Sequence, residues 1–181
     1  MLFERKNTVQ GQFTGPVFFG SRKKRLFLFG ILIVLVSIFL WYETEKVLVI
    51  QAKNSNIQDR IVNIPDGKWY LSYTHSVQKT LVEEFFQVQE QGFLLYETRF
   101  SSYGVGLPFL ATDGKLKIMP DGRMQLLLQR TFPLVKVWTG QEAKVELKTK
   151  NETLELYKIY PAGSLLEINV LPRYKIFISN F

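Results

Sequence analysis

The sequence predicts an all-β domain, an antiparallel sandwich or barrel of short hairpins, preceded by one N-terminal transmembrane helix. Three observations predict this architecture. An uncharged apolar run occupies residues 26–42. After residue 47, apolar and polar residues alternate with a period of two, which is typical of strands that bury one face. Turn signals interrupt the alternation at short intervals, as expected for an all-β sandwich or barrel.

The apolar run, LFLFGILIVLVSIFLWY, contains no charged residue and no proline, and it follows four consecutive cations, Arg22 to Arg25. A membrane-spanning helix needs about 20 apolar residues, with a lower limit near 17. A cleavable signal peptide is the main alternative, because the cationic flank suits one. However, Trp41 and Tyr42 stand where small residues would mark a cleavage site, and aromatic residues are typical of a membrane interface. We therefore expect an uncleaved signal anchor over residues 26–42.

A buried core helix is a further alternative for this run. Its one polar side chain, Ser37, can hydrogen-bond within its own helix, so the run has no polar stripe. This pattern favours the membrane over a protein core.

The cations on the N-terminal side set the expected orientation. By the positive-inside rule, residues 1–25 form a cytoplasmic tail and the chain after the helix lies outside. We expect a single-pass protein of the cell membrane, with an extracytoplasmic β-domain over residues 47–181.

Charge and composition exclude several function classes. Residues 1–42 carry +5 of the net charge of +7, so the basic character belongs mainly to the membrane flank and does not indicate nucleic-acid binding. The absence of cysteine excludes disulfides, thiolate metal sites and a cysteine nucleophile. The part of the chain after residue 42 is long enough for one domain with a core.

The alternation after residue 47 predicts ten or more short strands. Turns are expected at Pro65-Asp66-Gly67 and at Pro120-Asp121-Gly122, since these residue types favour turns. No sustained helical pattern follows residue 47. The last three predicted strands cover residues 154–160, 165–171 and 173–179.

His75, the one histidine of the chain, lies in SYTHSVQKTLVEE at residues 72–84, where polar residues crowd between apolar ones. Strand alternation places Tyr73 and His75 on one face. Residues 72–75 are expected to pair with the strand that begins at residue 80. Because Glu83 and Glu84 point to opposite faces, one of them shares the face of His75 in any register.

Three kinds of chemistry remain open for these residues. Ser76 neighbours His75 on an extended chain and is poorly placed as its nucleophile. A metal site of His75 with Glu83 or Glu84 is a weak candidate, since zinc sites use three or four such ligands. A polar network is the third hypothesis, in which Arg130 balances the second acid and either fixes the hairpin or binds an anionic ligand. We expect no cofactor, and the pattern leans away from an enzyme.

The segments SYTHSVQKTLVEEFF at residues 72–86 and LYETRFSSYGVGLP at residues 95–108 resemble a bacterial family known only as a domain of unknown function. Its members share a Tyr-Thr-His-Ser-Val core, a following Val-Glu-Glu and a Tyr-Gly-x-Gly-Leu-Pro stretch. The resemblance covers residues 68–137. Family members are small, membrane-anchored or secreted, and often encoded beside tripartite (TRAP) transporters of the TAXI type.

This resemblance implies an accessory role at such a transporter, with its membrane subunit or solute-binding protein as partner. It directs attention to a set of residues that we call the motif residues: Thr74, His75, Ser76, Glu83, Glu84, Tyr103, Gly104, Gly106 and Arg130. Three functions are therefore carried forward. They are an accessory or binding domain, a metal-dependent or acid–base enzyme centred on His75, and a structural envelope module without a ligand.

Overall fold

The computed structural model describes residues 19–53, 57–102 and 114–179. The chain divides into two compact units, residues 1–42 and residues 43–181. The first contains helix α1 and the second contains the β-domain.

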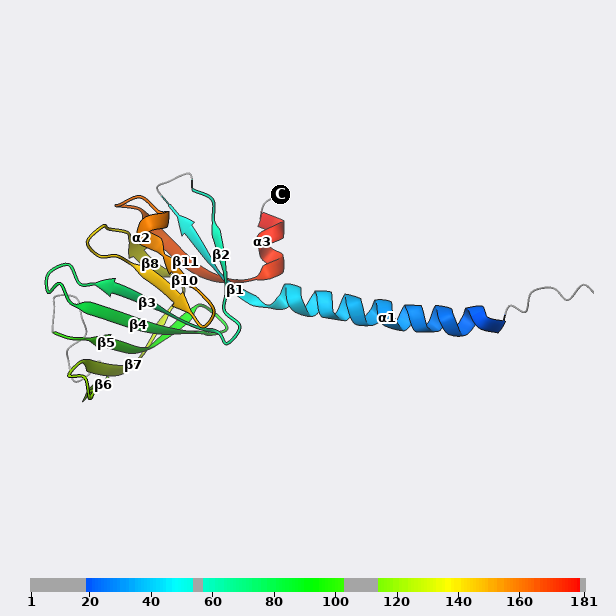
Figure 1. Cartoon of the computed structure of the whole chain (residues 1–181), viewed down its shortest axis with the longest axis horizontal. Helices are drawn as coiled ribbons and strands as arrows, with labels where there is room; N and C mark the ends of the chain where they lie inside the picture. The colour runs from blue at the N-terminus through cyan, green and yellow to red at the C-terminus, as the bar shows by residue number, and fades with distance from the viewer. Residues whose placement is uncertain (1–18, 54–56, 103–113, 180–181) are drawn as a thin grey trace, which may run out of the picture. The chain divides into compact units, whose positions relative to one another are not determined.

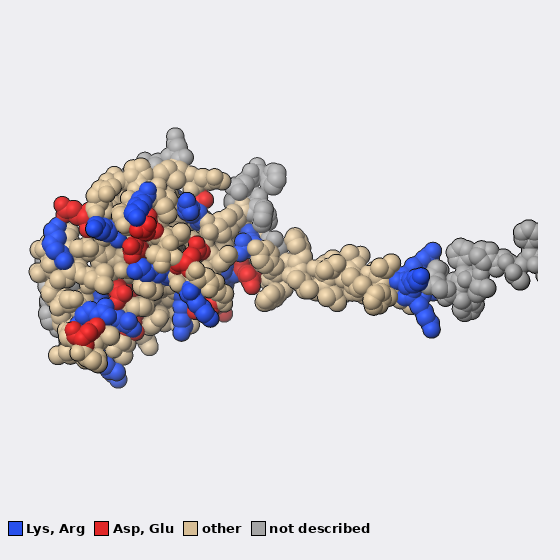
Figure 2. All heavy atoms as spheres, viewed as in Figure 1, with Lys and Arg blue, Asp and Glu red and all other residues tan. Residues whose placement is uncertain are grey.

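Helix α1 (Phe19–Thr44) is longer than the predicted apolar run. Its segment Arg22–Tyr42 is long and apolar enough to cross a membrane, and its side chains are exposed along this length, so the buried-core-helix alternative is wrong. The Ser37 Oγ donates a hydrogen bond of 2.8 Å to the carbonyl oxygen of Ile33, as predicted. Figure 2 shows basic side chains gathered at the N-terminal end of the described helix, the position of Arg22 to Arg25.

The β-domain consists of two antiparallel sheets, and the predicted all-β antiparallel fold is confirmed (Figure 1). The four-stranded sheet has the order β2 (Arg60–Asn63), β1 (Lys46–Ala52), β11 (Leu165–Pro172), β8 (Val135–Trp138). The seven-stranded sheet has the order β10 (Thr153–Glu155), β9 (Glu146–Thr149), β3 (Lys68–Thr74), β4 (Leu81–Val88), β5 (Phe93–Phe100), β7 (Met124–Phe132), β6 (Lys115–Ile118).

One hydrophobic core joins the two sheets. Leu48 and Ile168 enter it from the four-stranded sheet, and Trp69 and Phe86 enter it from the seven-stranded sheet. The rings of Trp69 and Phe86 stack with centroids 4.5 Å apart, and Phe93 meets Trp69 edge-on at 5.2 Å. We call the face of the seven-stranded sheet that carries Trp69 and Phe86 the inner face, and the opposite one the outer face.

The predicted turn at Pro65-Asp66-Gly67 joins β2 to β3 and moves the chain from one sheet to the other. The Gly67 amide donates to the carbonyl oxygen of Ile64 over 2.8 Å, and the Asp66 carboxylate accepts from the Lys68 amide over 3.1 Å. Gly67 has a φ of +66°, which favours glycine. The turn therefore delivers β3 to the seven-stranded sheet.

The predicted strand over residues 154–160 is wrong in its second half. After β10 the chain forms the single-turn helix α2 (Leu156–Ile159). Leu156 and Tyr160 are both buried, and the Tyr160 amide donates to the carbonyl oxygen of Leu156 over 2.9 Å. Strand β10 ends at Glu155, whose partner Glu146 is the first residue of β9, so the residues that follow Glu155 have no strand residue to pair with.

The predicted strand over residues 173–179 is also wrong, because these residues form helix α3 (Arg173–Ser179). Strand β11 pairs with β1 as far as Pro172, which lies opposite Lys46. Before Lys46 the chain leaves the sheet and soon becomes α1, so the alternating pattern of residues 173–179 has no strand to pair with. An amphipathic pattern this short is compatible with either structure, and the end of the sheet decides it.

Candidate functional site

A cleft of about 380 Å³ opens between the seven-stranded sheet and the edge strand β8 of the four-stranded sheet. We call it the β3–β8 cleft. Its size falls in the range of small-molecule sites. Its lining residues come from β3 and the turn after it, from β4, from β8 and from the segment before β9: Leu71, Tyr73, Thr74, His75, Ser76, Glu84, Val135, Lys136, Val137, Trp138, Ala143 and Val145.

Strand register brings Glu84 into this cleft. Leu71 on β3 lies opposite Glu84 on β4, so Glu84 is on the inner face, the face of Tyr73 and His75. Its neighbour on β5 is Thr98. Glu84 is partly buried, and neither of its cross-strand neighbours carries a charge. A carboxyl group therefore lies among uncharged neighbours on this stretch of the sheet.

Tyr73 and Glu84 form a hydrogen-bonded pair at the floor of the cleft. Burial raises the pKa of the Glu84 carboxyl, and the hydrogen bond from the Tyr73 hydroxyl offsets part of this effect. Burial also raises the pKa of Tyr73, followed by the charge of Glu84 and the hydrogen bond to it. The environment thus disfavours the ionised carboxylate more than water does, and a cationic partner would reverse this.

His75 fixes the turn that follows β3. Its backbone amide donates to the carbonyl oxygen of Thr80 over 2.8 Å, and its carbonyl oxygen accepts from the Lys79 amide over 2.9 Å. Its side-chain Nδ1 lies 3.3 Å from the amide nitrogens of both Val77 and Gln78, which donate to it. Because Nδ1 accepts, the proton of the neutral ring is carried by Nε2.

This tautomer argues against a serine-hydrolase role for His75. In a catalytic triad the Nδ1 hydrogen is donated to an orienting carboxylate, and Nε2 accepts the proton of the nucleophile. In this turn the Nδ1 is instead an acceptor from two backbone amides. His75 therefore acts first as a side-chain cap of its own turn, in the way that an Asn or Asp caps an Asx-turn.

The opposite wall of the cleft comes from β8. The Lys136 ammonium lies 3.1 Å from the Glu167 carboxylate, which also pairs with Lys53 at 3.1 Å. Two cations share Glu167, and the positive charge of Lys136 is directed to that carboxylate. Trp138 is among the lining residues of the cleft, and 60% of its surface is exposed.

Of the motif residues, Thr74, His75, Ser76 and Glu84 line the β3–β8 cleft. Glu83 lies opposite Ser72 on the outer face and so outside it. Arg130 is exposed on β7, opposite Leu95, and does not line the cleft. Tyr103, Gly104 and Gly106 lie outside the described residues.

The predicted pairing of the second acid with Arg130 is wrong. The cation that pairs with Glu83 is Arg123, whose Nη1 lies 2.8 Å from the Glu83 Oε2 and whose Nε lies 2.7 Å from Asp121. Glu83 lies opposite Arg99 on β5, and Arg99 lies opposite Gln125 on β7, so Arg130 stands five residues farther along β7. Counting along the sequence does not reveal this alignment, which also includes two register shifts, one between Phe85 and Phe86 and one between Leu95 and Glu97.

Within the described ranges, no group of three or more histidine, aspartate or glutamate side chains is placed to hold a metal ion. His75 and Glu84 share a face and a cleft, whereas Glu83 faces away and pairs with Arg123. The sheet thus separates Glu83 from the other two weak metal candidates. What the cleft offers is a carboxyl group, a phenol and an indole on apolar walls, which are suited to binding a small group.

Sequence reasoning missed Lys136 and Trp138, because nothing in the sequence indicates that β8 lies beside β3. Tyr73 was placed on the face of His75, yet its pairing with Glu84 depends on the register. An exposed tryptophan in a strand pattern is the one signal that could have drawn attention to Trp138.

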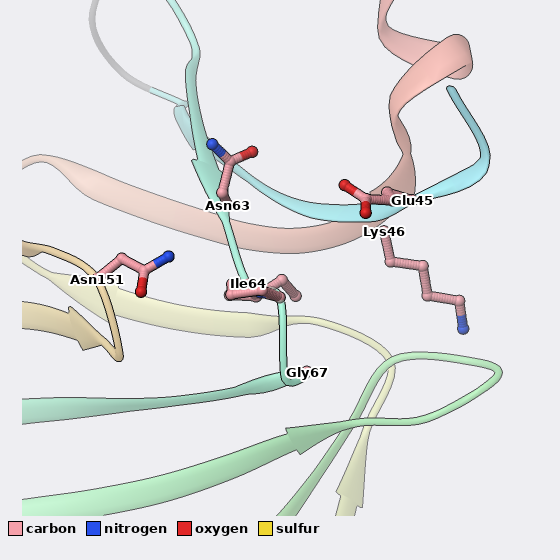
Figure 3. Close-up of a pocket in the computed structure, with 7 residues that line it drawn as sticks. Glu45, Lys46, Asn63, Ile64, Gly67 and Asn151 are labelled. Atoms are coloured by element: carbon pink, nitrogen blue, oxygen red, sulfur yellow. The ribbon is translucent and has the colours of Figure 1, made fainter. Parts of the chain in front are cut away.

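A second hollow of about 280 Å³ lies where β1 begins and β2 ends (Figure 3). Lys46 extends away from Asn151 in this view, and its ammonium donates to the carbonyl oxygen of Gln89 over 2.9 Å. Asn63 accepts a hydrogen bond from the Arg173 guanidinium at 2.5 Å. These polar groups tie the end of the domain together, and none of the motif residues that the structure describes lies there, so the β3–β8 cleft is the stronger candidate.

Residues 70–156 match a family described as Domain of unknown function (DUF1850). The matched segment begins in β3 and ends at the first residue of α2, so it includes the residues of the β3–β8 cleft. The expected resemblance to a domain-of-unknown-function family is confirmed in this form. Comparisons of the chain with curated proteins and with solved structures gave no match.

Proposed function

We propose that the chain is a membrane-anchored, extracytoplasmic binding domain that assists a solute transporter, with the β3–β8 cleft as its binding site. The observation that carries the proposal is the cleft itself, which gathers four motif residues that the sequence alone leaves unassigned. Binding is favoured over catalysis because His75 uses Nδ1 to cap a turn.

The N-terminal helix supports the location. Its segment Arg22–Tyr42 is long and apolar enough to cross a membrane. Four cations, Arg22 to Arg25, stand at the N-terminal end of this segment. The positive-inside rule then places the β-domain outside the cytoplasm, where a transporter's solute-binding protein works. The resemblance to a family encoded beside TRAP transporters of the TAXI type supports such a transporter as partner, by association.

Co-purification in mild detergent tests the proposal. Full-length protein with a tag at its C-terminus is expressed in its own host, and we expect the transporter membrane subunit or its solute-binding protein to be retained. Trp138→Ala, at the exposed rim of the cleft, should weaken retention, whereas Ile118→Ala, 79% exposed on β6 and outside the cleft, should leave it unchanged. Equal retention by both variants would exclude the cleft, and no retention by the unaltered protein would exclude the transporter role.

A further inference from the structure

We infer that the β3–β8 cleft binds a small organic cation, an ammonium group on an apolar carrier, with Glu84 as its counter-ion and Trp138 over its outer end. The inference rests on the proposed binding function and names the ligand class. It replaces the anionic ligand that the sequence left open, because Arg130 does not line the cleft.

The sign of the ligand's charge follows from the charges that line the cleft. Lys136 is the one cationic side chain of constant charge among the lining residues, and its ammonium is engaged by Glu167 at 3.1 Å. Glu84 receives a hydrogen bond from Tyr73, a neutral group, and within the described part of the chain no ion pair is found for it. The cleft therefore has an uncompensated acid at its floor, and an ammonium group is its electrostatic complement.

Trp138, a lining residue of the cleft, also favours a positively charged ligand. An indole ring attracts a cation over its face, and this attraction grows when water is excluded. Trp138 lines the cleft and is 60% exposed, so its side chain is accessible to a ligand. A carboxylate below and an aromatic ring at the rim are a combination that binds ammonium ions and disfavours carboxylates.

The remaining lining residues indicate the chemistry of the apolar group that bears the ammonium. Leu71, Val135, Val137, Ala143 and Val145 are the aliphatic lining residues. A cleft of about 380 Å³ with such walls accommodates a short alkyl chain. We therefore assign the ammonium group to a small solute, and the lysine side chain of a partner protein becomes an alternative outcome of the test.

Ammonium binding should also be coupled to proton release. Burial raises the pKa of Glu84, and a bound cation lowers it again, so the ligand displaces a proton over the pH interval below the raised pKa. The other titratable groups that face Glu84 in the cleft are Tyr73 and His75 on the side of β3 and Lys136 on β8. The apparent affinity should rise with pH through the pKa of Glu84 and then level off.

Isothermal titration calorimetry of the full chain in lipid nanodiscs tests the inference, with n-butylammonium chloride as the probe. We expect the unaltered protein to bind it and Glu84→Gln to lose about tenfold or more in affinity, since the counter-ion is gone while the shape is kept. Glu83→Gln is the matched control, a neighbouring residue on the outer face, and should bind as the unaltered protein does. 1-Pentanol and pentanoate, of similar size and with no charge or the opposite charge, should bind less tightly.

Unchanged affinity in a folded Glu84→Gln protein, or tighter binding of pentanoate, would overturn the inference. Circular dichroism establishes that the variant is folded, and Trp138→Leu provides a second variant at an exposed position, expected to weaken binding several-fold. A capped lysine tripeptide that binds more tightly than n-butylammonium would assign the site to a protein partner. Co-purification of the transporter without ammonium binding would remove this inference alone, whereas ammonium binding without co-purification would remove the transporter role alone.

Discussion

Glu83 and Glu84 are adjacent in the sequence, yet they lie on opposite faces of the sheet and have different partners. Glu83 lies on the outer face of the seven-stranded sheet, 2.8 Å from Arg123, in a network that continues to Asp121. Glu84 lies on the inner face, partly buried in the β3–β8 cleft, with the Tyr73 hydroxyl as its hydrogen-bond partner. Neighbouring residues of a strand point to opposite faces. Glu83 is therefore paired with a cation on the outer face, whereas burial raises the pKa of Glu84 on the inner face.

The same contrast appears in the aromatic pairs of β3 and β4. On the inner face Trp69 stacks on Phe86 at 4.5 Å within the core. On the outer face Tyr70 stacks on Phe85 at 4.8 Å, and the Arg99 guanidinium lies 4.4 Å from the centre of the Phe85 ring. Each face has a stacked aromatic pair, and the difference is whether the other sheet covers it. The inner face therefore contributes residues both to the hydrophobic core and to the candidate site.

The largest expected effect is the difference in lost stability between variants of the two aromatic pairs. Phe86→Ala should lower the free energy of unfolding by about 3–5 kcal/mol, because it leaves a cavity beside Trp69. Phe85→Ala should cost only about 1–2 kcal/mol, because its ring is partly exposed. Urea denaturation of both variants measures the difference, and equal losses would contradict the assignment of the core to the inner face.

A smaller effect is expected at His75. His75→Ala should cost about 1–2 kcal/mol, because the amides of Val77 and Gln78 lose their shared acceptor. His75→Asn should recover most of this loss, since an Asn side-chain oxygen is placed to accept from the same amides. Thermal unfolding of the pair provides the measurement.

The comparison of the two His75 variants also separates structure from function. If both lose stability equally, Nδ1 does not cap the turn. If His75→Asn is stable but fails to retain the transporter in the co-purification, the remainder of the imidazole ring has a binding role, and the hypothesis of a purely structural module is excluded.

The next expected effect is on the pH dependence of the free energy of unfolding, and its sign differs between Glu84 and Asp121. The pKa of Glu84 is raised, so its protonated form favours the folded state, and this stability is lost as pH rises through the raised pKa. The hydrogen bonds from Arg123 lower the pKa of Asp121, so its contribution is lost as pH falls through that lowered pKa. Glu84→Gln should flatten the loss of stability toward higher pH, and Asp121→Asn should flatten the loss toward acid.

Urea denaturation at a series of pH values tests both signs in one experiment. The unaltered protein and both variants are compared across the range from acid to neutral pH. A Glu84→Gln protein with the same pH dependence as the unaltered protein would show that Glu84 is ionised as freely in the folded chain as in the unfolded one.

The smallest effect is expected for the ion pair of the outer face. Arg123→Ala should cost about 0.5–1 kcal/mol, because both partners keep part of their surface in water. A double-mutant cycle with Glu83→Gln isolates the coupling, and added salt should reduce it. A coupling above about 2 kcal/mol would mean that the outer face is less solvated than its exposure indicates.

Local patterns could be predicted from the sequence, and pairings between distant segments could not. Alternation placed His75 and Tyr73 together and put one of the two glutamates beside them, because a strand has a fixed period. The assignment of Arg130 to the second acid failed, because Glu83 aligns through Arg99 with Gln125 and not with Arg130, and local sequence does not contain the alignment of three strands. Trp138 could not be assigned to the site, since its strand reaches β3 through the packing of two sheets.

The errors at α2 and α3 have a related cause. Both segments alternate as strands do, and both meet a place where no neighbouring strand continues. A period-two pattern indicates that a segment can form a strand if a neighbouring strand is available to pair with it. The presence of the partner is a property of the whole sheet, which local sequence does not contain.

The order of the four-stranded sheet has a mechanical consequence for a tethered protein. The chain that leaves α1 enters the sheet as β1, an interior strand that is hydrogen-bonded to β2 on one side and to β11 on the other. Tension on the tether is therefore shared by two ladders at once, and a fraying edge strand never bears it alone. The amides of β1 should accordingly be among the slowest of the domain to exchange with solvent deuterium. A domain built in this way should resist a pull on the chain before β1 without beginning to unravel at its first strand.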